Sequence, residues 1–171
     1  DQIADKLHKT YFEGYFNYVG AKTIIAEYDY VDRDYLEDYV SYYVKCFHEY
    51  QRYCTRLHFF NADYSDDDFK SLLSGNMERA KDFENTYLGF IVIKPLPKTI
   101  FGRTCLKTYP KENRRYFPVN RDYEANLFGL HLNVRTLAYQ EQDQVAAACA
   151  TSALWSIFHA TGNLFHHPIP T

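Results

Sequence analysis

The segment at residues 87–94 reads YLGFIVIK, and prolines follow it at positions 95 and 97. A short, continuous apolar run that is rich in β-branched and aromatic residues is typical of a buried strand. Proline has no N–H group to donate to a strand ladder, so the strand must stop at Lys94. The rest of the chain therefore has to supply the elements that cover this segment.

Other segments also have the composition of strands. Residues 23–30 (TIIAEYDY) are β-branched and alternate at their end, and residues 56–60 read RLHFF. Residues 104–108 and residues 126–137 are two weaker candidates, and the second alternates between apolar and polar side chains. These segments predict a mixed or antiparallel sheet.

A long helix is expected after the first strand. Asp34 is placed to cap it, and Glu37, three residues later, would complete a capping box. Tyrosines and other apolar residues then recur at a spacing of three to four as far as Cys54, which predicts one buried helical stripe. Both Cys46 and Cys54 fall on that stripe.

Three more helices follow from capping residues and glycines. A helix over residues 3–20 is expected to end at Gly20. A helix over residues 67–73 is expected to be capped by the acidic cluster at 65–68 and to end at Gly75. The last helix should cover about 144–160, with Gly162 at its end. The fold class predicted is α+β, a sheet with several helices that ends in an Ala-rich helix carrying Cys149.

Length and composition narrow the class of protein. A chain of 171 residues with 46% hydrophobic residues favours one globular domain, or one domain and part of another. No apolar run approaches the roughly 20 residues that a membrane helix needs. The 17 tyrosines predict a core that includes a polar network, since buried hydroxyl groups need partners.

Charge is distributed unevenly along the chain. Residues 1–70 hold 8 basic and 14 acidic residues, whereas residues 71–171 hold 11 and 8. Between positions 94 and 121 there are eight basic residues and one acid, Glu112. Such a stretch either meets an anionic partner, including nucleic acid, or is a solvated loop that balances the acidic part. The residues that we expect to bind such a partner are Lys94, Lys98, Arg103, Lys107, Arg114 and Arg115.

The cysteines do not form a disulfide framework or a recognised zinc spacing. Four cysteines in 171 residues, with irregular spacing, predict reduced thiols in a cytoplasmic protein. Cys46 with His48 and Cys54 with His58 are the nearest approach to a metal site, and no cofactor or metal is expected. We expect His58 and the neighbouring Arg56 to bind buried tyrosine hydroxyls or acids such as Asp32 and Asp34 instead.

Cys149 is the strongest candidate for chemistry. Small residues surround it in QEQDQVAAACATSALW (140–155), which would let a substrate approach the helix closely. A thiol near a helix N-terminus has a lowered pKa, because the positive end of the dipole favours the thiolate. A glutamine just before it could donate its amide to a developing oxyanion. The alternative is a small, inert core residue on an Ala-rich helix.

This segment resembles the nucleophile region of papain-like cysteine peptidases, including the bacterial bacteriocin-processing type. The resemblance covers residues 140–165 and rests on Gln142, Val145, Cys149, Ala150, Ala153, Leu154 and Trp155. It implies that Cys149 is the nucleophile and that Gln142, or Gln144, binds the oxyanion. The implied histidine base would lie beyond Thr171, because His159 is ten residues along the same helix.

Two functions are therefore expected from different classes. The first is a fragment of a cysteine peptidase or thiol acyltransferase that acts on peptide or isopeptide bonds of a peptide or protein substrate. Residues 1–125 would then be an α+β module and residues 126–171 the start of a truncated peptidase domain, in a chain that is a piece of something longer. The alternative is a non-catalytic module that binds protein, or less favourably nucleic acid, through residues 94–121. No membrane partner is expected.

Overall fold

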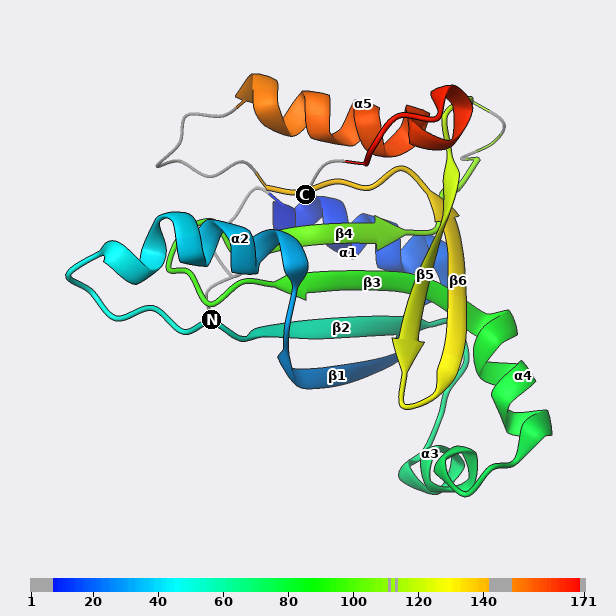
Figure 1. Cartoon of the computed structure of the whole chain (residues 1–171). Coiled ribbons are helices and arrows are strands. Elements are labelled where there is room, and N and C mark those ends of the chain that lie inside the picture. The colour runs from blue at the N-terminus through cyan, green and yellow to red at the C-terminus, as the bar shows by residue number, and fades with distance from the viewer. Residues whose placement is uncertain (1–7, 111, 113, 142–148, 170–171) are drawn as a thin grey trace.

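A computed structural model describes residues 8–110, 112, 114–141 and 149–169. Its centre is an antiparallel four-stranded sheet whose spatial order follows the sequence: β1 (Thr23–Tyr30), β2 (Cys54–Phe60), β3 (Tyr87–Ile93) and β4 (Phe101–Leu106) (Figure 1). A separate two-stranded hairpin, β5 (Arg121–Leu127) and β6 (Leu130–Thr136), runs across these strands. The predicted α+β class with an antiparallel sheet is confirmed.

The buried strand predicted at residues 87–94 is β3, which pairs with β2 on one side and β4 on the other. All its residues are buried except the last, Ile93. Gly89 has a φ of 115°, and a Cβ at this position would overlap the carbonyl oxygen of Cys105 in β4. A glycine is therefore required here, because the neighbouring strand passes too close for any side chain.

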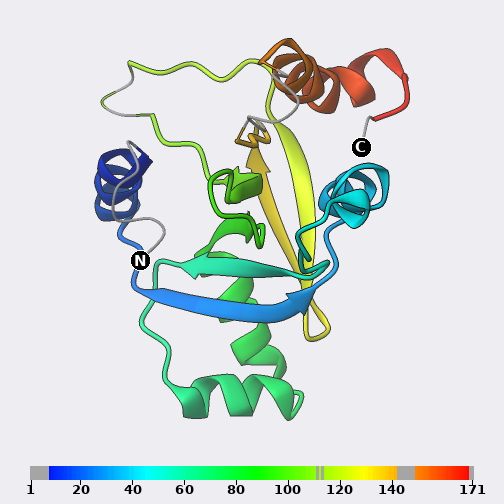
Figure 2. The same ribbon diagram turned by 90° about the vertical axis from the view of Figure 1, so that its left-hand side faces the viewer.

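Each face of the sheet carries its own apolar core. Helix α1 (His8–Val19) places Phe12 and Phe16 against one face, where Phe59 and Leu88 are buried. Helix α2 (Arg33–Ser41) and the hairpin cover the opposite face, on which the larger core lies (Figure 2). The alternation of β2 assigns its even-numbered residues from Cys54 to this larger core.

The long helix predicted from Asp34 to Cys54 is wrong beyond Ser41. Asp32 is the N-cap, and its side chain accepts a hydrogen bond of 3.0 Å from the N–H of Tyr35. After α2 the chain makes only a short 3₁₀ turn, Tyr43–Lys45, and Cys54 pairs with Tyr30 as the first residue of β2. Tertiary pairing thus overrides a local helical spacing, and Cys46 is half-buried on a turn instead of lying in a helical stripe.

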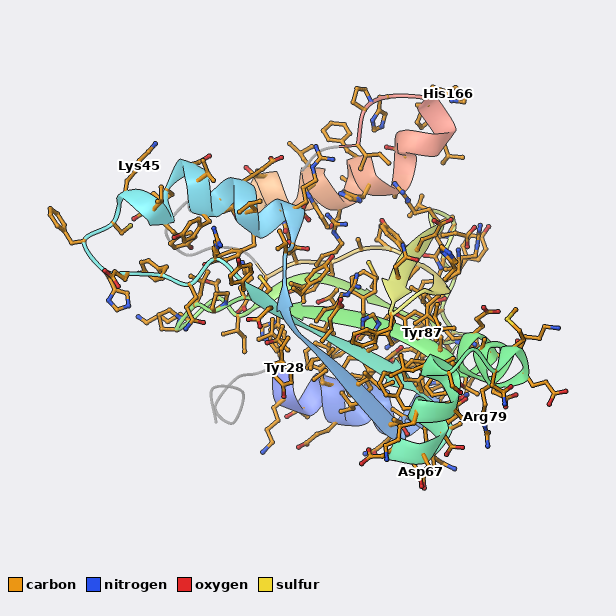
Figure 3. The ribbon with its side chains drawn as sticks, turned by 60° about the horizontal axis from the view of Figure 1, so that its bottom comes forward. Tyr28, Lys45, Asp67, Arg79, Tyr87 and His166 are labelled. Carbon is orange, nitrogen blue, oxygen red and sulfur yellow. The ribbon has the colours of Figure 1, made fainter. Side chains whose placement is uncertain are left out.

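The helix predicted after the acidic cluster is α3 (Asp66–Leu73), which Ser65 caps in a complete capping box with Asp68. A further helix, α4 (Met77–Thr86), was not expected from the sequence. Asn76 caps it by accepting from the N–H groups of Glu78 and Arg79, and Phe83 is its one buried residue. The two helices lie at the end of the molecule where Asp67 and Arg79 are labelled (Figure 3).

The predicted strand at 126–137 is instead the second half of the β5–β6 hairpin. The turn is formed by Phe128 and Gly129, whose φ values are 48° and 90°. An apolar residue flanks the turn on each side. The strand predicted at 104–108 lies in β4, which begins earlier, at Phe101. The alternation of apolar and polar side chains continues through the turn residues. The sequence pattern therefore does not indicate that the chain reverses direction there.

Helix α5 (Cys149–Phe165) carries Cys149, and residues 144–148 of the predicted helix lie outside the described residues. The expected end at Gly162 is wrong, because the helix continues to Phe165. Gly162 is buried, and a Cβ there would come within 2.8 Å of the Ile169 side chain. This glycine allows the chain that follows the helix to fold back against it.

The predicted boundary between residues 125 and 126 falls inside β5. Trp155 of α5 belongs to the same buried cluster as Tyr35 of α2 and Phe60 of β2. The described parts of residues 1–125 and 126–171 therefore share one core. That a peptidase domain starts in this part of the chain stays a prediction.

Candidate functional site

Cys149 is the first residue of α5, and the chain that leads toward it is held at the edge of the sheet. Tyr139 exchanges two backbone hydrogen bonds with Thr104 of β4, of 2.7 and 3.0 Å. Two residues later, the N–H of Glu141 donates to the Phe101 carbonyl at 2.8 Å, and a Glu141 carboxylate oxygen accepts from the Phe101 N–H at 3.1 Å. Gln142 and Gln144, the predicted oxyanion residues, lie outside the described residues.

The buried side of α5 is an aromatic stack. The ring of His159 lies 4.0 Å from that of Trp155 and 6.1 Å from that of Tyr123 in β5, measured between centroids. Arg121 donates to the backbone oxygen of His159 at 2.9 Å. Because His159 is ten residues from Cys149, the helical rise separates them by about 15 Å. His159 therefore packs α5 onto the hairpin, as a structural residue of the core.

The other two histidines after Cys149 lie at the far end of α5. His167 is 2.9 Å from the hydroxyl of Thr161, and its ring meets that of Phe158 edge to face. His166 is exposed, with a φ of 52°, in the residue after the helix. Both lie at the opposite end of α5 from Cys149, and the origin of a base stays a prediction.

Two of the predicted binding residues lie inside the molecule. Lys94 is buried at the end of the central strand. Arg103 of β4 forms a forked ion pair with one oxygen of Asp34 in α2, at 3.1 Å from Nε and 2.6 Å from Nη2. The ion pair of the partly buried Arg103 fastens α2 to the sheet. Lys94 is buried, and the charge of Arg103 is already paired, so neither offers a free surface charge to nucleic acid.

The remaining predicted binding residues differ in their surroundings. Lys98 is exposed in the connection between β3 and β4, and Arg114 pairs with Glu112 at 3.4 Å on the surface. Lys107 and Arg115, in contrast, line a cleft of about 550 Å³. The basic stretch therefore divides into core, surface and cleft residues.

This cleft, which we call the α1 cleft, lies between α1 and the described part of the segment 107–120, residues 107–110, 112 and 114–120. That segment follows β4 and passes over α1 on the same side of the molecule (Figure 2). Tyr11, Phe12 and Tyr15 come from α1, and the last residues of β4 and the residues after β6 complete the wall. The sequence predicted the basic residues but not the cleft, because the aromatic residues of its wall come from the other end of the chain.

Hydrogen bonds and ring contacts hold the α1 cleft together. The hydroxyl of Tyr15 donates to the backbone oxygen of Lys107 at 2.8 Å. The guanidinium of Arg115 lies 4.2 Å above the ring centroid of Tyr109 and makes a side-chain hydrogen bond with Tyr11. Burial raises the pKa of Tyr11, and Arg115 offsets part of that rise. The hydroxyl of Tyr11 therefore stays protonated and neutral at physiological pH.

A second polar cluster is buried between the sheet and the hairpin. His58 lies 2.9 Å from the hydroxyl of Tyr87, which sits within the molecule at the start of β3 (Figure 3), and 3.4 Å from Glu27. Arg56 bridges Glu27, at 2.7 Å, and the backbone oxygen of Asn126 in β5, at 2.5 Å. The expected tyrosine partner of His58 is present, but the acid is Glu27 instead of Asp32 or Asp34.

This cluster has the groups of a proton relay without access for a substrate. His58 is 0% exposed, and burial, together with Arg56, lowers its pKa to about 3. The imidazole is therefore neutral, and its contacts serve to join the sheet to the hairpin. We assign the cluster a structural role.

Within the described ranges, no group of three His, Cys, Asp or Glu side chains is placed to hold a metal ion. In the same ranges, no helix has the length and apolar character needed to cross a membrane. No family model, no curated protein and no solved structure matches the chain. The functional argument therefore rests on the residues themselves.

Proposed function

We propose that this chain supplies the nucleophile of a papain-like cysteine peptidase or a related thiol acyltransferase. The observation that carries the proposal is that Cys149 is the first described residue of α5, a short distance after the anchored residues 139–141. The first turn of a helix has unpaired N–H groups and the positive end of the dipole, which favour a thiolate over a thiol. The anchored segment before it, from Tyr139 to Glu141, gives the lead-in a fixed starting point.

In the proposed reaction, the thiolate of Cys149 attacks the carbonyl carbon of a peptide or isopeptide bond. Gln142 would donate its amide to the oxyanion, and a histidine from a further part of the protein would protonate the departing amine. Water, or an acceptor amine in an acyltransferase, then takes the acyl group from sulfur and restores the thiol. The reaction needs reduced cysteines, for which we propose a cytoplasmic location.

The proposal predicts that iodoacetamide labels Cys149 well below about pH 7, whereas an ordinary thiol waits for about pH 8.5. The experiment uses the longest form of the protein, and peptide mass mapping identifies each labelled site. Cys54 and Cys105 are buried controls whose pKa values burial raises, that of Cys54 to about 12. Half-buried Cys46 is the reference. Labelling of Cys149 only on unfolding would contradict the proposal and identify a core residue.

A second candidate function is binding without catalysis through residues 94–121. The observation that favours it is that Lys107 and Arg115 line the α1 cleft. A continuous basic track along a phosphate backbone would need Lys94 and Arg103 free at the surface, whereas Lys94 is buried and Arg103 is paired with Asp34. For this candidate we therefore propose a partner that enters the cleft, in preference to nucleic acid.

A further inference from the structure

We infer that the α1 cleft binds a small aromatic molecule that carries an anionic group. This inference rests on the second candidate function and is independent of Cys149. It names the chemistry of the ligand from three properties of the cleft: its size, its aromatic walls and the sign of its charge.

The size of the cleft corresponds to a small molecule. Its volume of about 550 Å³ falls within the range of roughly 300–1,000 Å³ that is typical of ligand pockets. The helix α1 and the segment 107–120 form opposite walls, and the Tyr15 hydrogen bond to the Lys107 backbone ties those walls together. The cleft is therefore held open by the fold.

The walls favour an aromatic ligand. Tyr11 and Tyr15 of α1 lie nearly parallel, with an interplanar angle of 13°, and Tyr109 meets Tyr15 edge to face at 5.4 Å. Tyr116 and Phe117 on the opposite wall are both at least partly exposed. Aromatic faces and edges attract another ring in stacked or edge-to-face geometry. A flat apolar ligand gains such contacts from both walls.

The charges favour an anion. Lys107 and Arg115 line the cleft, and no Asp or Glu is among the described residues that do so. In the described part of the chain neither basic side chain forms an ion pair, whereas the adjacent Arg114 pairs with Glu112. Arg115 uses one face of its guanidinium on Tyr109. A side-chain hydrogen bond with Tyr11 uses part of its N–H edge, and the other N–H groups are suited to a carboxylate, sulfonate or phosphate.

A second apolar groove provides a comparison within the same molecule. It lies between α1 and the open part of the sheet, where Ile24 and Leu57 are among its lining residues. Among the described residues that line it, the charged ones are Lys9 and Glu13, which pair with each other at 3.9 Å. This groove has no excess of positive charge, so an anionic aromatic probe should prefer the α1 cleft.

The test uses two fluorescent probes that differ in charge: 8-anilinonaphthalene-1-sulfonate and its neutral counterpart N-phenyl-1-naphthylamine. Arg115→Gln is expected to weaken binding of the sulfonate about five-fold or more, since it removes a charge-assisted hydrogen bond. Binding of the neutral probe should change less than about two-fold. The matched control is Arg114→Gln, which removes the neighbouring charge outside the cleft and should leave both affinities unchanged.

Val119→Trp tests the location independently of charge. Val119 lines the cleft and is 37% exposed, so a larger side chain there fills the cleft without disturbing the core. It should weaken both probes, whereas Val40→Trp on the exposed side of α2 should weaken neither. Circular dichroism checks that each variant is folded.

Two results would overturn the inference. One is equal binding of the sulfonate by the Arg115 and Arg114 variants, and the other is unchanged binding of both probes to the Val119 variant. A Cys149→Ser variant should bind both probes as the parent does. Loss of thiol reactivity and loss of cleft binding are therefore separate outcomes, and either proposal can fail alone.

Discussion

His58 lies in β2 with its ring fully buried between the hydroxyl of Tyr87 and the carboxylate of Glu27. Its sequence context, a histidine among apolar residues near cysteines, is compatible with a metal ligand, a base or a core residue. Burial and the nearby charge of Arg56 decide between them, because both oppose protonation of the imidazole. The surroundings of the residue, more than its type, determine its role.

The lowered pKa of His58 predicts acid sensitivity. The unfolded chain protonates this histidine below about pH 6.5, whereas the folded protein resists protonation until about pH 3. The contribution of His58 to the free energy of unfolding is therefore fully present above pH 6.5. It falls as the pH decreases toward 3, by up to about 1.4 kcal/mol per pH unit. Urea unfolding of the parent and of His58→Gln between pH 4.5 and 7.5 measures the difference.

The His58→Gln variant is expected to be less stable than the parent at pH 7.5, because its contact with Tyr87 is altered. The distinguishing result is the slope: its stability should fall less steeply below pH 6.5. Equal slopes for the two proteins would mean that folding leaves the pKa of His58 unchanged, and would contradict the lowered pKa.

At the scale of elements, local sequence patterns predicted where helices and strands lie better than they predicted where each one begins and ends. Ser65 and the acids after it predicted α3, and the apolar run predicted β3, because a cap and a buried run are short-range features. The tyrosine spacing after Asp34 predicted too long a helix, since the same residues also fit the aromatic cluster of Tyr35, Tyr43 and Tyr50 without a helix. Pairing of Cys54 with β1 is a long-range contact that no local pattern contains.

The ion pair between Asp34 and Arg103 is expected to hold α2 on the sheet. Asp34→Asn leaves the partly buried guanidinium without its counter-charge and should destabilise the protein by about 2 kcal/mol or more. The control is Arg135→Gln, which breaks an exposed pair with Asp122 and should cost less than about 1 kcal/mol. Thermal unfolding compares the two variants, and similar losses in both would contradict a pinning role for Asp34.

At the scale of the whole molecule, α5 packs on the same core as the sheet. Trp155 is 4% exposed within that core, next to His159 and above the hairpin residue Tyr123. The helix that carries the candidate nucleophile is thus supported by residues from distant parts of the chain.

Trp155 is the only tryptophan, so its fluorescence reports on α5 alone. Because α5 shares the core, urea unfolding followed by this fluorescence and by far-ultraviolet circular dichroism should give coincident transitions. A fluorescence transition at clearly lower urea would show that α5 unfolds separately from the sheet. A Leu154→Ala variant is the control, since Leu154 is 49% exposed and its loss should leave the midpoint nearly unchanged.

The sequence by itself determined the α+β class, the central strand, the capped helix α3 and the presence of Cys149 on the last helix. These features depend on neighbouring residues, through hydrogen bonding, capping and the burial of short apolar runs. Only the tertiary structure decided that Lys94 is buried, that Arg103 pairs with Asp34 and that Lys107 and Arg115 meet tyrosines from α1. The reason is that burial and charge pairing depend on which segments pack together, and those partners lie up to about a hundred residues apart.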